Sequence, residues 1–463
     1  MPGASVRPSR PNERAWVLVT LALAFFAPAL WAGEPAAVTV VPSAVAPSTA
    51  DLAVVEPSAV GLDAERLARI DQRFVAYTEA GEWVGGMGLI ARRGEVAFLE
   101  LWGQRDREQG LPVEEDTIFR IYSMSKPVTS VAVMMLFEEG HFGLWDPIAR
   151  YIPELADLQV LEDVSDPDAG EPTTRLRPAA RQPTILDLLR HSAGLTYGYF
   201  GNTPVDRMYR ERQILAGQAD LAELVHELGQ LPLLYDPGTR WHYSVATDVL
   251  GRLVEVVSGQ PFESFLKARI FDPLGMVDTG FTVPAAKRPR FAQLYSPKAA
   301  GDGDELWLEG STRGALEVAR QELDQVFRPE ATFQSGGGGL VSTAHDYLRF
   351  CHMILGGGAL DGHRILSRKT LELMAQDHTR GLERPYPVPG VGFGLGFDVV
   401  EEPGRLGELS SKGLLSWAGA AGTGFWIDPE EEMVGIFMTQ IIPHTGLTYR
   451  KQFRHLAYQA IAD

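Results

Sequence analysis

The sequence holds a serine and a lysine spaced for nucleophilic chemistry, Ser123 and Lys126, where an aromatic-rich segment meets an apolar run. Residues three apart share one face of a helix, so the lysine can reach the serine hydroxyl. At a helix start, free N–H groups and the positive dipole end stabilise developing negative charge. Pro127 favours a helix start, because proline is tolerated in a first turn. Taken alone, this pattern also fits a buried helix with an incidental lysine.

A second candidate, Tyr243, lies about 120 residues downstream, after a turn at 236–238 and before an apolar segment that ends at Ser258. A serine hydroxyl is a poor nucleophile until a base takes its proton. Lysine and tyrosine side chains can both act as such a base when they are suitably placed. The alternative for Tyr243 is a core aromatic residue with a satisfied hydroxyl. The adjacent His242 could tune the site or simply pack.

A third candidate is the stretch of small residues from Ser416 to Phe425, which contains Gly419, Ala420 and Gly422. Small residues in a strand let its backbone approach a ligand closely. A backbone N–H there, together with the N–H of the nucleophile, would form an oxyanion hole. The stretch also fits a glycine-rich strand edge beside a helix.

With these three motifs in order, the chain resembles the serine β-lactamase-fold hydrolases, and in particular the class C-like branch that includes the family VIII carboxylesterases. The resemblance runs from about Val60 to the C-terminus. It includes less specific landmarks at residues 184–195, 272–276 and 335–343. It implies an α/β (α+β) fold, with an antiparallel sheet flanked by helices and a mainly helical lobe.

The resemblance also implies roles for individual residues. Ser123 would accept the acyl group, and Lys126 and Tyr243 would form the proton-transfer pair. The oxyanion hole would come from the backbone N–H groups of Ser123 and Ala420. No cofactor and no metal are implied.

Two departures from the β-lactamase pattern bear on the substrate. The third motif usually begins with a lysine that meets the substrate carboxylate, and here Trp417 stands in its place. The loss of a charge-assisted contact costs about 1.5–3 kcal/mol. The second motif usually ends in asparagine, and here Val245 cannot hydrogen-bond an amide. Both changes favour neutral, apolar acyl groups, so we expect a small-molecule ester as substrate.

The candidate substrate-binding residues are Trp417, Gly419, Val245 and Tyr197. The loop that carries Tyr197 fits a surface loop equally well.

Two other functions remain open at this stage. One is a D-amino-acid peptidase or weak β-lactamase, and the other is an inactive penicillin-binding-fold protein that acts as a binder. No pair of histidines at i, i+4 and no Gly-x-Ser-x-Gly occurs, which argues against a zinc-protease helix and an α/β-hydrolase elbow.

Charge and N-terminal composition bear on location. The formal charge of −18 argues against nucleic acid or an anionic membrane as partner. Residues 1–32 carry three arginines before an uncharged stretch, which predicts a cleaved signal peptide and an exported, periplasmic or extracellular protein. An uncleaved anchor is the alternative, but the stretch is short for a span. The single Cys351 is expected to be buried, and the sequence leaves the oligomeric state open.

The predicted organisation is a signal peptide over 1–32, a flexible leader over 33–59 and a hydrolase domain over 60–463. Its helical lobe is expected at about 141–285, with an exposed excursion over 163–181. Helices are expected over 63–79, from the Ser123 region to about 139, and from about 449 to the end. Strands are expected over 87–91, 96–102, 391–400, 424–427 and 433–440.

Overall fold

The structure is a computed structural model. The structure describes residues 52–164, 173–298, 316–320, 327, 331–384, 387–443 and 448–463. All of them belong to the unit Val38–Asp463. The predicted signal peptide, residues 1–32, and most of the predicted leader, 33–59, lie outside the described residues. Within the described ranges, no helix has both the length and the apolarity needed to cross a membrane.

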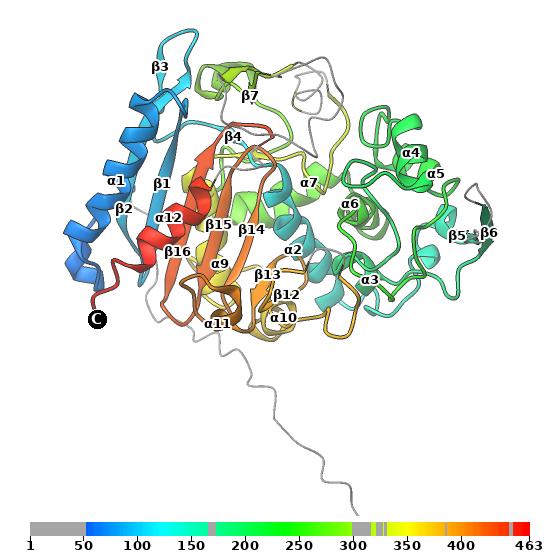
Figure 1. Ribbon diagram of the computed structural model, residues 1–463. Coiled ribbons are helices and arrows are strands. Elements are labelled where there is room, and N and C mark those ends of the chain that lie inside the picture. Colours follow the sequence, from blue (N-terminus) through cyan, green and yellow to red (C-terminus); the bar gives the residue numbers. More distant parts are fainter. Residues whose placement is uncertain are drawn as a thin grey trace, which may run out of the picture. The chain divides into compact units, whose positions relative to one another are not determined.

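An antiparallel sheet forms the centre of the described fold, confirming the expected fold class (Figure 1). Its strand order is β12-β13-β14-β15-β16-β1-β2-β3 within the described residues. The strands are β1 (Gly85–Arg92), β2 (Glu95–Asp106), β3 (Leu111–Pro112), β12 (Val391–Phe393), β13 (Asp398–Val400), β14 (Leu415–Ala418), β15 (Gly424–Asp428) and β16 (Met433–Thr439). The β1–β2 hairpin joins the C-terminal strands because β1 pairs with β16. All seven residues of β16 are buried, as its continuous apolar run predicts for a strand covered on both faces.

One predicted strand is wrong in extent. The segment 391–400 was expected to be continuous, but it forms the two short strands β12 and β13 around a turn. Gly396 in this turn has φ +109°, a conformation that favours glycine. A Cβ there would lie 2.6 Å from Oγ of Ser130, so a side chain would not fit.

The two faces of the sheet carry different helices. Helices α1 (Ala64–Glu79) and α12 (Tyr449–Tyr458) cover one face, where Phe74 and Phe453 pack on Phe437 of β16 (Figure 1). The aspartate before α1 caps it by accepting the Arg66 N–H. On the other face lie α2 (Ser125–Glu138), α9 (Ala344–Leu355) and α10 (Arg368–Met374). The short helix α11 (Pro403–Leu406) packs through Leu406 on the same apolar cluster as α1 and α12.

Helix α2 is the buried axis of the fold. Every residue from Ser125 to Leu136 is buried, as expected for a helix that is apolar all round. It packs against α6 on one side and against the sheet region on the other. The start of α2 is therefore held rigidly between the sheet and the helical part of the chain.

The segment between residues 141 and 285 is mainly helical but also holds two strands that the sequence analysis did not expect. Its helices are α3 (Ile185–Leu189), α4 (Pro204–Glu211), α5 (Leu221–Leu228), α6 (Ala246–Ser258), α7 (Phe262–Leu266) and α8 (Asp272–Leu274). Strands β5 (Gln159–Asp163) and β6 (Thr174–Pro178) form a hairpin. Most of β6 is exposed. It lies within the stretch that was predicted to be an exposed excursion, of which residues 165–172 are outside the described residues.

Candidate active site

The candidate nucleophile lies at the point where α2 begins. Ser123 is in a single 3-10 turn, Tyr122–Met124, that leads directly into the helix, so the predicted helix start is confirmed. The preceding residue, Tyr122, has φ +41°. Such a conformation is uncommon for a residue with a side chain and is found most often at functional sites. The turn places the Ser123 hydroxyl at the N-terminal end of α2.

Lys126 lies one helical turn further on, as its spacing predicted. Its side chain is buried, with 1% exposure. The ammonium Nζ donates to Oγ of Ser123 at 3.2 Å and to the carbonyl of Gly337 at 2.5 Å. It also lies 4.6 Å from the ring centroid of Tyr243 and 5.3 Å from that of Tyr197. These rings and the carbonyl give the ammonium group favourable electrostatic contacts in place of water.

Tyr243 reaches the same hydroxyl from another part of the chain. It lies three residues before α6, in a segment tied to residue 191 by the backbone bond from His242 N–H to the His191 carbonyl. Its phenol donates to Oγ of Ser123 at 2.7 Å. The structure therefore brings the three predicted residues together around one oxygen, at distances that allow proton transfer.

Asp248 is a buried carboxylate of this site that the sequence analysis missed. One of its oxygens accepts from Ser335 Oγ at 2.5 Å and from the Gly337 N–H at 3.1 Å. Burial raises the pKa of this carboxyl group, while Ser335 and the charge of Lys126 act in the opposite direction. Burial also raises the pKa of Tyr197, with Tyr243 and Asp248 adding to the effect. An acidic residue in an apolar segment just after Tyr243 was the signal available in the sequence.

Asp248 is linked to Lys126 through the backbone of Gly337. Gly337 receives a hydrogen bond from Lys126 on its carbonyl and gives one to Asp248 from its N–H. The glycine-rich turn at 336–339 therefore lies directly beside the lysine side chain. A Cβ at Gly337 would lie 2.6 Å from the Asp248 carboxylate, so this contact requires glycine.

The third motif forms the end of β14 and the turn that follows. The N–H of Gly419 donates to the Thr423 carbonyl at 2.9 Å, which closes the turn. A Cβ at Gly419 would meet the carbonyl oxygen of Ile121 at 2.5 Å. Glycine thus lets the turn approach the segment that carries Ser123. Ala420, at the next position, lines the same cavity as Ser123.

The Ser123 hydroxyl opens into a cavity of about 780 Å³. Trp417 lines it, and its indole contacts the rings of Tyr243 and Phe393, with centroids 5.5 and 5.2 Å apart. Two further aromatic residues also line it, Phe200 in the same loop as Tyr197 and Trp241 just before Tyr243. The cavity is therefore polar at the nucleophile and lined by aromatic side chains, as is usual for small-molecule pockets, and it also has charged lining residues such as Asp398 and Arg450.

The other two predicted substrate-binding residues lie differently. Val245 is fully buried and is not among the described residues that line the cavity, so an effect on substrate choice would have to be indirect. Tyr197 contacts the Tyr243 ring, with centroids 5.1 Å apart. His242 packs with its Nε2 3.3 Å from Thr196 Oγ1, and burial lowers its pKa.

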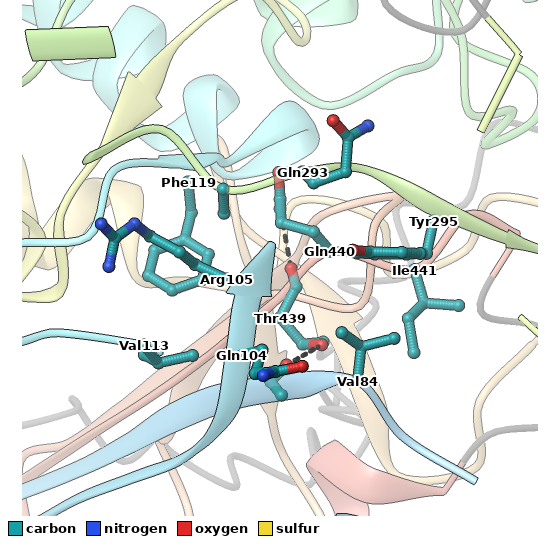
Figure 2. A pocket seen from close by; sticks show the side chains of 12 residues that line it. Val84, Gln104, Arg105, Val113, Phe119, Gln293, Tyr295, Thr439, Gln440 and Ile441 are labelled. Atoms are coloured by element: carbon teal, nitrogen blue, oxygen red, sulfur yellow. Dashed lines mark hydrogen bonds between the residues drawn. The ribbon is translucent and has the colours of Figure 1, made fainter. Parts of the chain in front are cut away.

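A separate small cavity lies near the sheet end, lined by Thr439, Gln440 and Tyr295 among others (Figure 2). Its volume is about 10 Å³, which is room for about one water molecule. The Gln440 amide donates to the Thr439 carbonyl at 2.7 Å, and the Thr439 hydroxyl donates to the Gly85 carbonyl at 2.9 Å. This cavity is too small for an organic substrate.

Comparison with known proteins gives consistent matches over most of the chain. The family described as "Beta-lactamase" matches residues 70–459. Protein Rv1367c of Mycobacterium tuberculosis is 37% identical over 377 residues, which is 79% of this chain and 88% of that protein. Esterase EstB of Burkholderia gladioli is 33% identical over 384 residues, 81% of this chain and 91% of that protein. The solved structure of EstCE1, a hydrolase with promiscuous acyltransferase activity, is 27% identical, with a TM-score of 0.68 over 85% of this chain and 99% of that one.

Proposed function

Because the chain belongs to the Beta-lactamase family, we propose that it hydrolyses carboxylic esters through an acyl-enzyme on Ser123. The observation that carries the proposal is the Ser123 oxygen, which lies within hydrogen-bond distance of both Lys126 and Tyr243 and faces an aromatic-lined cavity. The similarity to Esterase EstB and to the hydrolase EstCE1 supports a serine ester hydrolase.

In the proposed reaction, the Lys126–Tyr243 pair acts with one member deprotonated, either the Lys126 amine or the Tyr243 phenolate. Ser123 Oγ attacks the ester carbonyl while its proton passes to this pair. The carbonyl oxygen takes the negative charge and is stabilised by the N–H groups of Ser123 and Ala420. Tyr243 returns the proton to the departing alkoxide, so the alcohol leaves and the acyl group stays on Ser123. Water, deprotonated by the same pair, then releases the acid and restores the hydroxyl.

The cavity favours neutral acyl groups. Trp417 presents an aromatic surface beside Tyr243, where a lysine would offer a cation to a substrate carboxylate. An indole has a single donor and no charge. A β-lactam or a D-alanyl peptide, each bearing a carboxylate, would therefore bind less well than a neutral ester of similar size.

The test is side-by-side turnover of p-nitrophenyl butyrate, nitrocefin and a D-alanyl-D-alanine peptide, by wild type and by Trp417→Lys. We expect the wild type to prefer the ester. The added cation of the variant should move the ratio of kcat/KM values towards nitrocefin by about tenfold or more. Phe200→Lys, a lysine added at another aromatic cavity position, is the matched control.

If the wild type prefers nitrocefin, the proposed esterase is instead a β-lactamase. If it prefers the peptide, it is instead a D-amino-acid peptidase. If none of the three is turned over by a folded protein that fluorophosphonates also fail to label, the chain is an inactive binder of the same fold. If Trp417→Lys leaves the ratio of kcat/KM values for ester and nitrocefin unchanged, Trp417 does not determine the preference for esters. The replacement of asparagine by Val245 then becomes the better explanation of that preference.

We also propose that the hydrolase domain spans 60–463, with a helical lobe at about 141–285, and that the protein is exported. Export is supported by the three arginines and the following uncharged stretch within residues 1–32. Cleavage near Ala32 would leave a more acidic chain, because the removed segment carries a net positive charge.

A further inference from the structure

The cavity at Ser123 extends beyond the reacting group to the other face of the sheet. Trp417, which lines it, packs on Tyr243, whereas Trp426, which also lines it, packs on Phe453 of α12. The same cavity is bordered by Arg454 of α12. We call the part between β13, β14, β15 and α12 the α12 arm. A cavity of about 780 Å³ has room for an ester that fills both regions.

The α12 arm contains a carboxyl group without a protein partner. Asp398 begins β13 and lines the cavity, and its side chain makes no hydrogen bond or ion pair within the ranges that the structure describes. Burial raises the pKa of Asp398 to about 7, although the charges of Arg384 and Arg454 act in the opposite direction. A half-buried carboxyl group left unpaired is costly unless water or a ligand completes its hydrogen bonds.

The other charged groups of the arm have partners. Glu408 accepts from Lys451 at 2.9 Å and forms an ion pair with Arg454. Arg450 donates to the Thr423 carbonyl at 3.0 Å. Between these groups lie apolar side chains, which are Val388, Val400, Leu406 and Trp426. Asp398 is thus a carboxyl group with open hydrogen-bonding capacity. The buried indole N–H of Trp426 is a second polar group of the arm that has no partner among the described residues.

The chemistry of the arm distinguishes between possible ligand groups. At Asp398 itself, a ligand carboxylate would be repelled by the ionised carboxyl group, and an ammonium group would be repelled by the nearby Arg384 and Arg454. An alkyl chain would bury Asp398 without a partner. A hydroxyl group can donate to the carboxylate or accept from the acid. Ser416 is the cross-strand neighbour of Asp398, and its hydroxyl adds another hydrogen-bonding group on the same face of the sheet.

We propose that the α12 arm binds a hydroxyl group that the ester carries away from its reacting carbonyl, with Asp398 as the specificity-determining residue. The inference rests on the proposed ester hydrolysis at Ser123. Binding energy from such a remote group would favour hydroxylated esters over alkyl esters of the same length. A site that hydrogen-bonds a substrate hydroxyl discriminates strongly against the analogue that lacks it.

The experiment compares pairs of esters that differ only in a terminal hydroxyl. One series varies the alcohol of butyrate esters from butyl to decyl, and a second series varies the acyl chain of p-nitrophenyl esters over the same range. Acid release gives kcat/KM for each ester. In the wild type, the hydroxylated member should be favoured about tenfold or more at one or more chain lengths.

The variants localise the effect. Asp398→Leu should bring the ratio of hydroxylated to alkyl ester to about one or below, and the isosteric Asp398→Asn should give an intermediate ratio. Asp157→Asn changes an exposed aspartate that does not line this cavity and should keep the wild-type ratio. If Asp398→Leu does not fold, Asp398→Asn carries the comparison.

A wild-type ratio near one in both series would overturn the proposal, as would a preference that survives both Asp398 variants. Turnover of the alkyl esters would leave ester hydrolysis standing in either case. A folded wild-type protein that hydrolyses no ester in either series would instead overturn the proposed function, and the inference with it.

Discussion

At the scale of single residues, the site depends on one oxygen with two hydrogen-bonding neighbours. Lys126 lies in α2 and Tyr243 lies in the segment before α6, and both contact Ser123 Oγ. The lysine ammonium also lies 4.6 Å from the tyrosine ring, so the two groups influence each other. They are therefore expected to work as one proton-transfer unit.

A double-mutant cycle tests this coupling. Lys126→Ala and Tyr243→Phe should each lower kcat for p-nitrophenyl butyrate by several orders of magnitude. The double variant should lose little more, because removing either member already disables the unit. Steady-state kinetics on folded proteins, checked by circular dichroism, provides the measurement.

Matched controls for the cycle lie away from the site. Lys369→Ala removes an exposed lysine of α10, and Tyr77→Phe removes a hydroxyl on α1. Both should keep wild-type kcat. Losses at Lys126 and Tyr243 that simply add in the double variant would contradict the shared role.

At the scale of elements, the start of α2 and the turn after β14 must lie close together. The glycine at 419 permits this approach, because its backbone lies against Ile121 and Thr423. The sequence predicted strands at the positions of β1 and β2, the start of α2, the C-terminal helix and the three residues now found around one oxygen. These features follow from local spacing, turn residues and the family resemblance.

Other features could not be predicted because they depend on contacts distant in sequence. Asp248 belongs to the site only through its hydrogen bond from the N–H of Gly337, which lies almost 90 residues later in the sequence. Glycine is required at position 396, in the turn that divides β12 from β13, because Ser130 of α2 packs against it. Asp398 lines the same cavity as Arg450 and Arg454 of α12, which come from the last helix of the chain. A single sequence shows none of these pairings.

Gly419→Ala tests the link between the two elements. The new methyl group would lie within about 2.5 Å of the Ile121 carbonyl and closer still to the Thr423 hydroxyl, so the turn that carries Ala420 must move. We expect kcat to fall by about 10²-fold or more, the loss typical of one missing oxyanion contact, with a smaller change in KM.

The matched control is Gly404→Ala, because a Cβ at that helical glycine would meet no atom within 4 Å. It should leave kcat unchanged. A Gly419→Ala variant with wild-type kcat would show that the turn at 419 does not have to approach Ile121 for catalysis.

At the scale of the described domain, the N-terminal and C-terminal parts complete one sheet. Strand β1 pairs with β16, and α1 and α12 cover the same face. Phe453 of α12 is fully buried there against Trp426, Phe437 and the backbone position of Gly88. The last helix therefore supports the strands that carry the third motif.

Phe453→Ala should lower the free energy of unfolding by about 3–5 kcal/mol, because it leaves a cavity between α12 and the sheet. Chemical denaturation provides the measurement. His455→Ala, at an exposed position of the same helix, should change stability by less than about 0.5 kcal/mol. Equal effects of the two substitutions would show that α12 is not anchored through Phe453.

The most direct measurement is covalent trapping of the nucleophile. Wild type and Ser123→Ala are incubated with a fluorophosphonate and with a slowly deacylating ester, and the modified peptide is identified by mass spectrometry. We predict a single adduct on Ser123 in the wild type, no adduct in the folded variant, and ester turnover reduced by about 10³-fold or more. An adduct on Ser125 or elsewhere, or a folded Ser123→Ala variant with near-normal turnover, would contradict an acyl-enzyme at Ser123.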